Sequence, residues 1–473
     1  MKEMNTNLMN LTVSKFRAIN KADIKLNGIT VVTGENGCGK TTLSRLLYVT
    51  IKTSRNFDEI VRRDLNRRLR EILRALTDLM QDFARIERIS SPDNSKEYSI
   101  RRVSYRSLLI KNDDDSDLSQ YEEKIYSYIN TIQDGINDYL SEKTAPNAKR
   151  SRQPLIEKRL QRIQQILQTL LNDDNPNKGE KGKMDDVFSL LDKLKIDLIQ
   201  PQRETAHQSF AAAMRTLESR NNNVFISELY RHFGDDLKKQ FNIIEFGVPI
   251  TDWEHQKLLM THGIQDCVYI DTPMAIMSDS YTDNEYWEDL ISVLQAPALA
   301  FPLDRQLNLV NKIISGEVSY SSDTIDDDFI YKRNDGAVFN LNDCATGIKS
   351  FGILQILLNN GRLNKNTILI IDEPEAHLHP QWIVEYARLI VLLNKQLGVK
   401  FFIASHNPDM VSAIKYIAQK EKVADSLNFY LAHKLPNTYS YYYIDLQRNI
   451  DPIFESFNIA LDRINQYGID EDE

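Results

Sequence analysis

The segment "GENGCGKTT", from Gly34 to Thr42, combines residue types and spacing that bind phosphate. Four residues separate Gly34 from Gly39, and Lys40 and Thr41 follow directly. Glycines let the backbone curl until its N–H groups point at phosphate oxygens, and a following helix adds the positive end of its dipole. Lys40 then reaches the β- and γ-phosphates, and the Thr41 hydroxyl ligates Mg²⁺. The segment predicts a loop for ATP with Mg²⁺, with further contacts from Asn36, Gly37, Gly39 and Thr42.

The residues around the loop favour this interpretation over a glycine turn with an exposed lysine. "GITVVTG" is a β-branched apolar run that leads into the glycines, and "KTTLSRLLYVTI" begins a predicted helix. A buried strand, a glycine loop and a helix in this order form the context in which the pattern binds phosphate.

A second chemical cluster stands 332 residues after Lys40 (372 − 40 = 332), in "TILIIDEPEAHLHP". Asp372 ends an apolar strand, where it is expected to support Mg²⁺, and Glu373 is expected to polarise the water that attacks the γ-phosphate. His406 ends the next apolar strand, "FFIASH", from which it can reach the γ-phosphate. We therefore predict Glu373 and His406 as catalytic residues, and Thr41 with Asp372 as metal ligands.

Thr346 and Gly347, in "CATGIKSFG", stand just before another predicted helix. A hydroxyl and free backbone amides at a helix N-terminus form an anion site. Because the chain already has its own phosphate loop, we expect this second site to serve the nucleotide of another copy.

Four regions are expected to position these residues in an α/β fold. Residues 1–53 predict two short strands, the phosphate loop and a helix. Residues 54–195 predict a mostly helical insertion, and residues 196–336 a return to strands, introduced by "LKIDLIQPQRE" (194–204). In residues 337–473, "ILIIDE" and "KFFIASH" are short and wholly apolar, as parallel strands buried on both faces are. The prediction is a mixed sheet with flanking helices and a large helical insertion.

The insertion carries apolar residues at spacings of four and three, as in Leu65, Leu69 and Ile72, from Tyr121 to Ile132, and from Ile156 to Leu170. Such stripes predict helices that pack against one another. Each lasts two or three heptads, which favours packing inside the insertion over a long protruding arm. A β-hairpin at 97–110 and a flexible loop at 172–186 are expected between the helices.

Composition excludes several classes of protein. The formal charge of −9 argues against a surface that is basic throughout, as a nucleic-acid coat would be. No apolar run approaches the roughly 20 residues that cross a bilayer. The three cysteines are far apart and predict neither a disulfide framework nor a metal site. The first residues lack the pattern of a secretory signal, so we expect a cytoplasmic protein without membrane contact.

Taken together, the phosphate loop, the distant "IDEPEAHLHP", "IASH" and the motif before the helix resemble the ABC-type ATPase heads. The style of the motifs is similar to SMC and break-repair ATPases and to the OLD ATPases. "DEPEAHLHP" with "ASHNPDMV" is especially similar to the compact heads of bacterial anti-phage systems. Stand-alone ATPases of such systems include the Septu type, which also accompanies retron reverse transcriptases, and the PARIS type. "CATGIKSFGILQ" and "VYIDTP" are most similar to the Septu ATPases of the PtuA type. The motifs that carry the resemblance cover about residues 8–53 and 338–410.

This resemblance implies roles for individual residues. Lys40 and Thr41 correspond to the Walker A pair and Asp372 to Walker B, with Glu373 as catalytic base and His406 as switch histidine. Gln200 or Gln202 is the candidate Q-loop residue. "ATGIK" stands where the family carries LSGGQ, so Thr346 keeps the hydroxyl while Ile348 replaces the second glycine. His379 occupies the place of the usual D-loop aspartate, a departure that argues against fast hydrolysis.

In such families two heads sandwich two ATP molecules, so the resemblance implies a homodimer or higher oligomer. The leading hypothesis is an ATP-hydrolysing sensor and scaffold subunit of an anti-phage complex that controls a separate nuclease, of HNH or Toprim type. We expect no nuclease activity in this chain, while retron msDNA or phage DNA is a candidate ligand. The alternative is an SMC-like DNA-repair or chromosome-associated ATPase. An ABC transporter head is disfavoured by the missing LSGGQ and by the large insertion.

Overall fold

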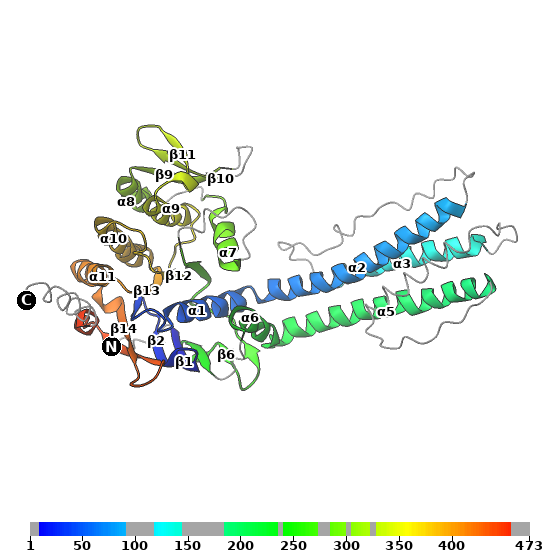
Figure 1. The fold of residues 1–473 in the computed structure, drawn as a ribbon, viewed down its shortest axis with the longest axis horizontal. Helices are drawn as coiled ribbons and strands as arrows, with labels where there is room; N and C mark the ends of the chain where they lie inside the picture. The colour runs from blue at the N-terminus through cyan, green and yellow to red at the C-terminus, as the bar shows by residue number, and fades with distance from the viewer. Residues whose placement is uncertain are drawn as a thin grey trace, which may run out of the picture. The chain divides into compact units, whose positions relative to one another are not determined.

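The computed structural model describes residues 9–90, 118–143, 184–234, 240–272, 284–298, 304–321 and 328–455 (Figure 1). The chain forms two compact units. The first combines Met1–Phe57 with Arg220–Glu473, and the second is Asp58–Ser219. The hairpin predicted at 97–110 and residues 172–183 of the predicted loop lie outside the described residues.

A ten-stranded sheet organises the first unit, in the order β5-β4-β1-β2-β15-β14-β3-β13-β12-β8. Strands β14, β3, β13, β12 and β8 pair in parallel, and most of the others are antiparallel. The bounds are β1 Met9–Phe16, β2 Ile19–Lys25, β3 Ile29–Thr33, β4 Phe241–Glu245, β5 Val248–Pro249, β8 Asp266–Ile270, β12 Thr367–Asp372, β13 Lys400–Ser405, β14 Leu427–Lys434 and β15 Tyr441–Gln447.

The parallel strands confirm the pattern expected of doubly buried strands. Every residue of β3 and β12 is buried, and in β13 only Lys400 is partly exposed. Strand β3 lies between β13 and β14, so the loop that follows it opens at the edge where β12 and β13 also end. The topology therefore gathers the predicted chemical residues at one edge of the sheet.

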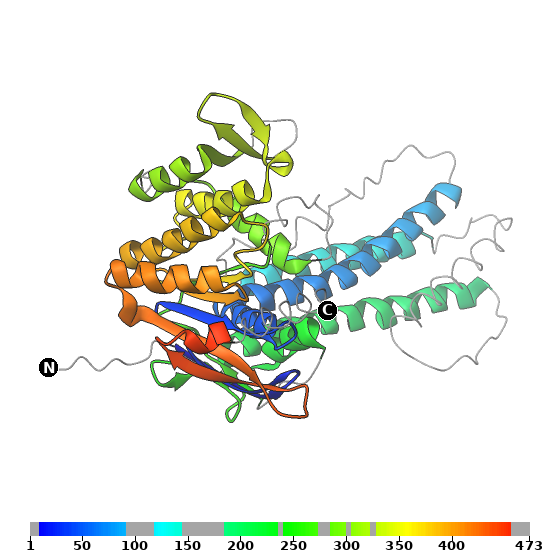
Figure 2. The same cartoon turned by 60° about the vertical axis from the view of Figure 1, so that its left-hand side comes forward.

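Helices cover the sheet, and a small second sheet, β11-β10-β9, lies beside them. Helices α9, α10 and α11, yellow to orange, stack side by side in Figures 1 and 2 and contribute to the main apolar core. The remaining bounds in this unit are α1 Lys40–Arg55, α6 Asn223–Phe233, α7 Glu285–Leu294, α8 Asp304–Ile314, α9 Thr346–Asn359, α10 Pro380–Leu397, α11 Pro408–Lys420, β6 Thr251–Asp252, β7 Lys257–Leu258, β9 Gly316–Ser321, β10 Asp328–Arg333 and β11 Val338–Asn340.

Two helices begin with the same local device. His379 caps α10 and Asn407 caps α11, and in each case a proline follows at the first helical position. Proline fits there because the first N–H groups of a helix have no partner inside it. "HLHP" thus gives His379 a structural role, since its Nδ1 accepts from the backbone N–H of Gln381 at 3.4 Å.

The second unit consists of long helices, α2 (Phe57–Ser90), α3 (Leu118–Lys143) and α5 (Met184–Ser219). Leu65, Leu69 and Ile72 are buried, as their spacing predicts, and α3 packs on α5. With 34 residues in α2 and 36 in α5, each of these helices is about 50 Å long at 1.5 Å per residue. We expected helices of only two or three heptads here, and that expectation was wrong, because α2 and α5 are longer.

The expected strand at 194–204 is also wrong, because these residues lie inside α5. The boundary expected at 195/196 falls within the same helix. Gln200 and Gln202 therefore belong to a helix of the second unit rather than to a loop after a sheet strand, and the Q-loop assignment loses its structural basis.

Candidate nucleotide-binding site

The loop between β3 and α1 has the curled backbone that its glycines predict. Gly34, Gly37 and Gly39 have φ angles of 149°, 83° and 100°, values that residues other than glycine rarely adopt. A Cβ on Gly39 would lie 2.7 Å from Cγ1 of Ile19. The loop thus needs glycine both for its conformation and for its close contact with β2.

Lys40 is almost fully buried at the start of α1, with 6% of its surface exposed. Its Nζ donates to the carbonyl oxygens of Gly34 at 2.9 Å and Glu35 at 3.1 Å, which holds the ammonium group across the loop. The first turn of α1 contains no acidic residue, and no side chain caps it. Positive charge and unpaired N–H groups therefore converge here, as an anion site requires.

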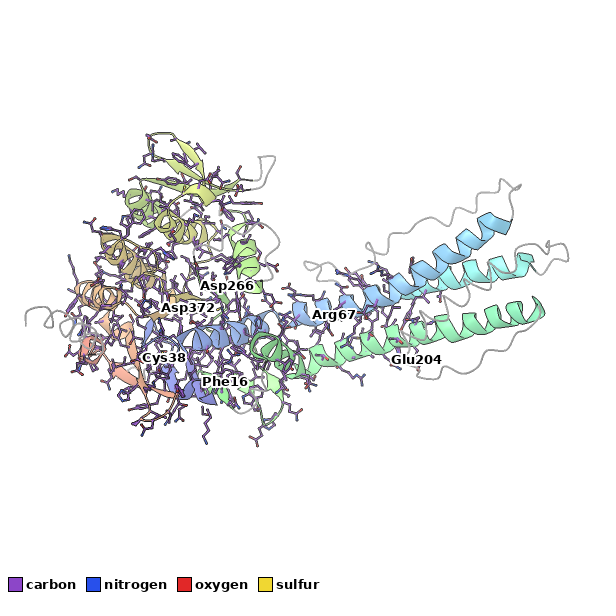
Figure 3. The ribbon with its side chains drawn as sticks, in the orientation of Figure 1. Phe16, Cys38, Arg67, Glu204, Asp266 and Asp372 are labelled. Atoms are coloured by element: carbon purple, nitrogen blue, oxygen red, sulfur yellow. The ribbon has the colours of Figure 1, made fainter. Side chains whose placement is uncertain are left out.

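Asp372 reaches this loop from the end of β12. Its carboxylate accepts hydrogen bonds from the Ser44 hydroxyl and, at 2.9 Å, from the Tyr269 hydroxyl, and the Thr41 hydroxyl is a third donor. Burial raises the pKa of Asp372, and these hydroxyl groups partly counteract the rise. Cys38 of the loop and Asp372 both lie in the interior of the first unit (Figure 3).

Sequence reasoning missed Ser44 and Tyr269. Ser44 stands three residues after Thr41 on α1, so helical spacing could have placed it on the same face. Tyr269 comes from β8, whose pairing with β12 brings Tyr269 opposite Ile370. No motif around Tyr269 reveals that pairing.

Glu373 and His406, predicted as the catalytic pair, lie together. Glu373 leaves β12 with a φ of 49°, while its backbone N–H still donates to the Ala404 carbonyl at 2.8 Å. This turn leaves 46% of its side chain exposed and places its Oε1 3.3 Å from Nδ1 of His406. Both side chains are accessible to solvent, as groups that handle a water molecule must be.

A cavity of about 280 Å³ lies between the loop and His406, lined by Thr33, Gly34, Glu35, Asn36, His406, Leu431 and Ile453. It joins the predicted phosphate loop and the predicted switch residue in one space. A larger hollow of about 530 Å³ lies elsewhere, over β1, β2 and β4, and contains none of the predicted residues.

Thr346 and Gly347 begin α9, whose N-cap residue Ala345 makes no side-chain cap. The first turn has no acidic residue, so no carboxylate competes with an anion to which its N–H groups could donate. A Cβ on Gly347 would lie 2.5 Å from Cε3 of Trp382. Packing against that ring, rather than approach to a phosphate, is the contact within the chain that requires glycine here.

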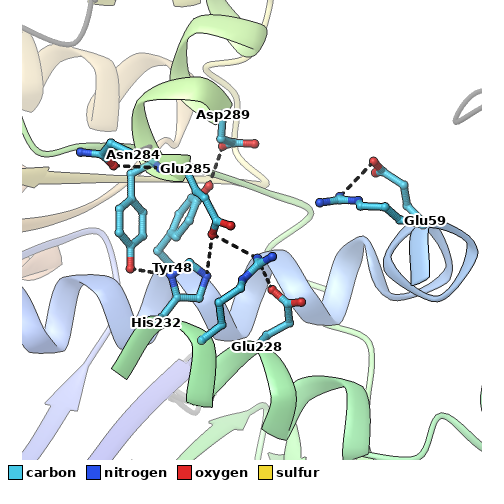
Figure 4. A network of polar contacts seen from close by, with 10 residues as sticks. Tyr48, Glu59, Glu228, His232, Asn284, Glu285 and Asp289 are labelled. Carbon is cyan, nitrogen blue, oxygen red and sulfur yellow. Dashed lines mark hydrogen bonds and ion pairs between the residues drawn. The ribbon is translucent and has the colours of Figure 1, made fainter. Parts of the chain in front are cut away.

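Helix α7 is tied to α1 and α6 by polar side chains (Figure 4). The Tyr48 hydroxyl donates to Asp289 at 2.7 Å, and the Tyr286 hydroxyl lies 3.0 Å from Nδ1 of His232. Burial lowers the pKa of His232 to about 4, so the ring is neutral at pH 7 and one of its nitrogens remains an acceptor. After β8 the chain continues with Asp271, which accepts from Nε1 of Trp287 at 2.8 Å.

Comparison with known protein families identifies the domain that contains this site. The model of the AAA ATPase domain family matches residues 7–411. The chain belongs to the AAA ATPase domain family. The domain has a mixed α/β fold, built on the ten-stranded sheet with helices that cover it. None of its described helices is long and apolar enough to span a membrane.

Curated relatives match only part of this AAA ATPase domain. The energy-coupling factor transporter ATP-binding protein EcfA3 of Clostridium perfringens is 36% identical over 91 residues, which are 18% of this chain and 32% of that protein. A putative ABC transporter ATP-binding protein of the same species, CPE0195, is 34% identical over 93 residues, 18% of this chain and 33% of that protein. The match thus spans about a third of the length of these relatives.

Solved structures are similar at a greater distance. A Pyrococcus furiosus Smc head domain with an extended coiled coil, bound to the C-terminal domain of ScpA, is 11% identical with a TM-score of 0.31; it covers 96% of this chain and 98% of its own. An SmcHead bound to the C-winged helix domain of ScpA is 10% identical with a TM-score of 0.35, at 94% and 98% coverage. Likeness at this level carries no information on function.

Proposed function

We propose that this AAA ATPase domain binds ATP with Mg²⁺ and hydrolyses it. The observation that carries the proposal is the 3.3 Å distance between Glu373 and His406, beside a phosphate loop whose following helix α1 contacts Asp372 through Ser44. Glu373 accepts the proton of the water that attacks the γ-phosphate, and His406 orients the γ-phosphate or that water. Lys40 binds the charge of the β- and γ-phosphates.

The residues present also fit Mg²⁺. Asp372 and Thr41 offer the hard oxygen donors that this ion prefers, and both already meet in one hydrogen-bonded cluster. Bound Mg²⁺ supplies charge that neutralises the phosphate oxygens during transfer. Ser44 and Tyr269 keep the Asp372 carboxylate directed toward the loop.

We further propose that two chains share each site. The open N-terminus of α9 at Thr346 offers an anion site, and no hydrogen bond or ion pair in the described part of the chain links it to the chain's own phosphate loop. ATP would then join two or more copies, with Thr346 and Gly347 of one copy against the γ-phosphate held by another.

Its biological setting, in our proposal, is an anti-phage complex in which this ATPase senses infection and controls a separate HNH or Toprim nuclease through ATP-dependent assembly. The likeness of "DEPEAHLHP" and "ASHNPDMV" to such heads supports this setting. The long helices α2 and α5 favour a second candidate, an SMC-like ATPase that acts on DNA. Co-purification with neighbouring gene products distinguishes them: a nuclease partner, with or without phage DNA or msDNA, supports the first, and chromosomal DNA without a nuclease supports the second.

Thr346→Arg tests the shared site, because a bulky cation would be forced into a closed seam. We expect the variant to bind ATP but to lose ATP-dependent association and the hydrolysis that depends on it. Mixing it with Lys40→Ala protein should restore part of the hydrolysis, since each mixed dimer regains one site with an intact loop and an intact facing α9. Phosphate release and mass are the measurements. Normal assembly and turnover by Thr346→Arg alone would contradict sharing.

A further inference from the structure

Glu375 lies three residues beyond Asp372 and is buried, with 4% of its side chain exposed. Its Oε1 accepts from the Ser405 hydroxyl at 2.8 Å and from the backbone N–H of His406 at 3.0 Å. The Ser405 hydroxyl in turn accepts from the backbone N–H of Asn407 at 3.1 Å. One carboxylate oxygen thus fixes the turn that leads from β13 into α11, the turn from which His406 projects.

The other oxygen, Oε2, is buried and has no hydrogen-bond partner among the residues that the structure describes. A buried acceptor left unpaired costs free energy, more so when it belongs to a charged group. The two hydrogen bonds that Oε1 accepts offset part of this cost, so a single oxygen of Glu375 holds the turn.

The same oxygen of Glu375 also faces the ring of His406. Its Nδ1 faces Glu373 Oε1 at 3.3 Å and Glu375 Oε1 at 3.6 Å. An ionised carboxylate can accept hydrogen bonds but cannot donate them. Two carboxylate oxygens that face Nδ1 therefore favour the tautomer that carries its proton on Nδ1. Nε2 is then the ring nitrogen that can contact a group other than these two carboxylates. Glu375 is buried while Glu373 is half-exposed, so Glu375 provides the fixed side of this arrangement.

We propose that Glu375 is a positioning residue for ATP hydrolysis, which holds the Ser405–His406 turn and keeps the His406 ring beside Glu373. Glu375 does not touch the substrate in this role and acts through His406. The inference rests on the proposed hydrolysis, which is measured first on the unaltered protein.

The test compares Glu375→Ala with Glu375→Gln. The glutamine oxygen can still accept from Ser405 and from the His406 N–H, so we expect kcat within about 3-fold of the unaltered protein. The alanine variant loses both hydrogen bonds, and we expect kcat to fall about 10-fold or more while the affinity for ATP changes less than about 3-fold.

Glu245→Ala is the matched control. Glu245 is equally buried and accepts from the backbone N–H groups of His262, Gly263 and Ile264. It lies near Lys400, at the end of β13 opposite to Ser405. We expect this variant to lower thermal stability without lowering kcat of the folded protein, which separates a loss of position from a loss of fold.

A double variant shows whether Glu375 acts through His406. In a His406→Ala background, Glu375→Ala should lower kcat less than about 2-fold, because the ring that it positions is already gone. An equal loss in both backgrounds would overturn the proposal, as would an unchanged kcat in Glu375→Ala. Loss of turnover in Glu375→Gln would also overturn the proposal, because it would indicate that Glu375 itself acts as a general base. An unaltered protein without ATPase activity would instead contradict the proposed function.

Discussion

Lys40→Ala is expected to abolish tight ATP binding. The Nζ of Lys40 is buried in the loop, and within the described residues its hydrogen bonds go to two carbonyl oxygens, which it can exchange for phosphate oxygens. Charge-assisted hydrogen bonds contribute about 1.5–3 kcal/mol each, so the loss should weaken binding by roughly 100-fold. Calorimetric titration with ATP measures the effect directly.

Lys395→Ala provides the matched control for this titration. Lys395 lies on α10 in a surface pair with Glu421 at 2.7 Å, outside the phosphate loop. This variant should bind ATP like the unaltered protein. Equal affinity in Lys40→Ala would mean that the loop from Gly34 to Thr42 does not bind the phosphates.

Glu373→Gln is expected to keep ATP bound while hydrolysis falls by about 100-fold or more, the lower range for loss of a general base. The amide has nearly the same shape as the carboxylate and can still contact His406, but it cannot accept the proton of the attacking water. Phosphate release measures turnover, and calorimetry measures binding of ATP in the same preparation.

Glu385→Gln is the control for that substitution, since Glu385 is a surface carboxylate paired with Arg388 at 3.3 Å. It should leave both quantities unchanged. Normal turnover by Glu373→Gln would show that another group takes the proton, and Glu375 would be the first to examine.

Much of the sheet in the first unit could be predicted, because its parallel strands have a distinctive sequence pattern. The wholly apolar runs that end at Asp372 and Ser405 are buried parallel strands, as expected. Since parallel strands end at one edge, the predicted residues Lys40, Asp372, Glu373 and His406 meet there. What each of these residues does remains a prediction.

Other parts of the site could not be read from sequence because they depend on which strands become neighbours. Tyr269 reaches Asp372 only because β8 pairs with β12 across about a hundred residues of intervening chain. Glu375 stands inside "DEPEAHLHP", yet its hydrogen bond with Ser405 requires the turn after β12 to fold back toward β13. No fixed spacing in the sequence predicts the contact of Tyr269 with Asp372 or that of Glu375 with Ser405.

The strand expected at 194–204 failed for a different reason. Ile196 and Ile199 are β-branched, and Pro201 would normally end a helix, so local propensity argued against one. The structure nevertheless continues α5 through Pro201, and α5 packs on α3. Packing over a long helix overrode the local preference.

The central claim is that ATP joins two or more copies of this chain through shared sites. Its most direct test is the mass of Glu373→Gln protein in solution with ATP and Mg²⁺, compared with ADP and Mg²⁺, because slowed hydrolysis preserves the ATP-bound state. The account predicts that ATP raises the mass by at least one whole chain and that ADP does not, and that the rise disappears when Thr346→Arg is added. A mass that stays the same while calorimetry shows ATP fully bound would contradict it.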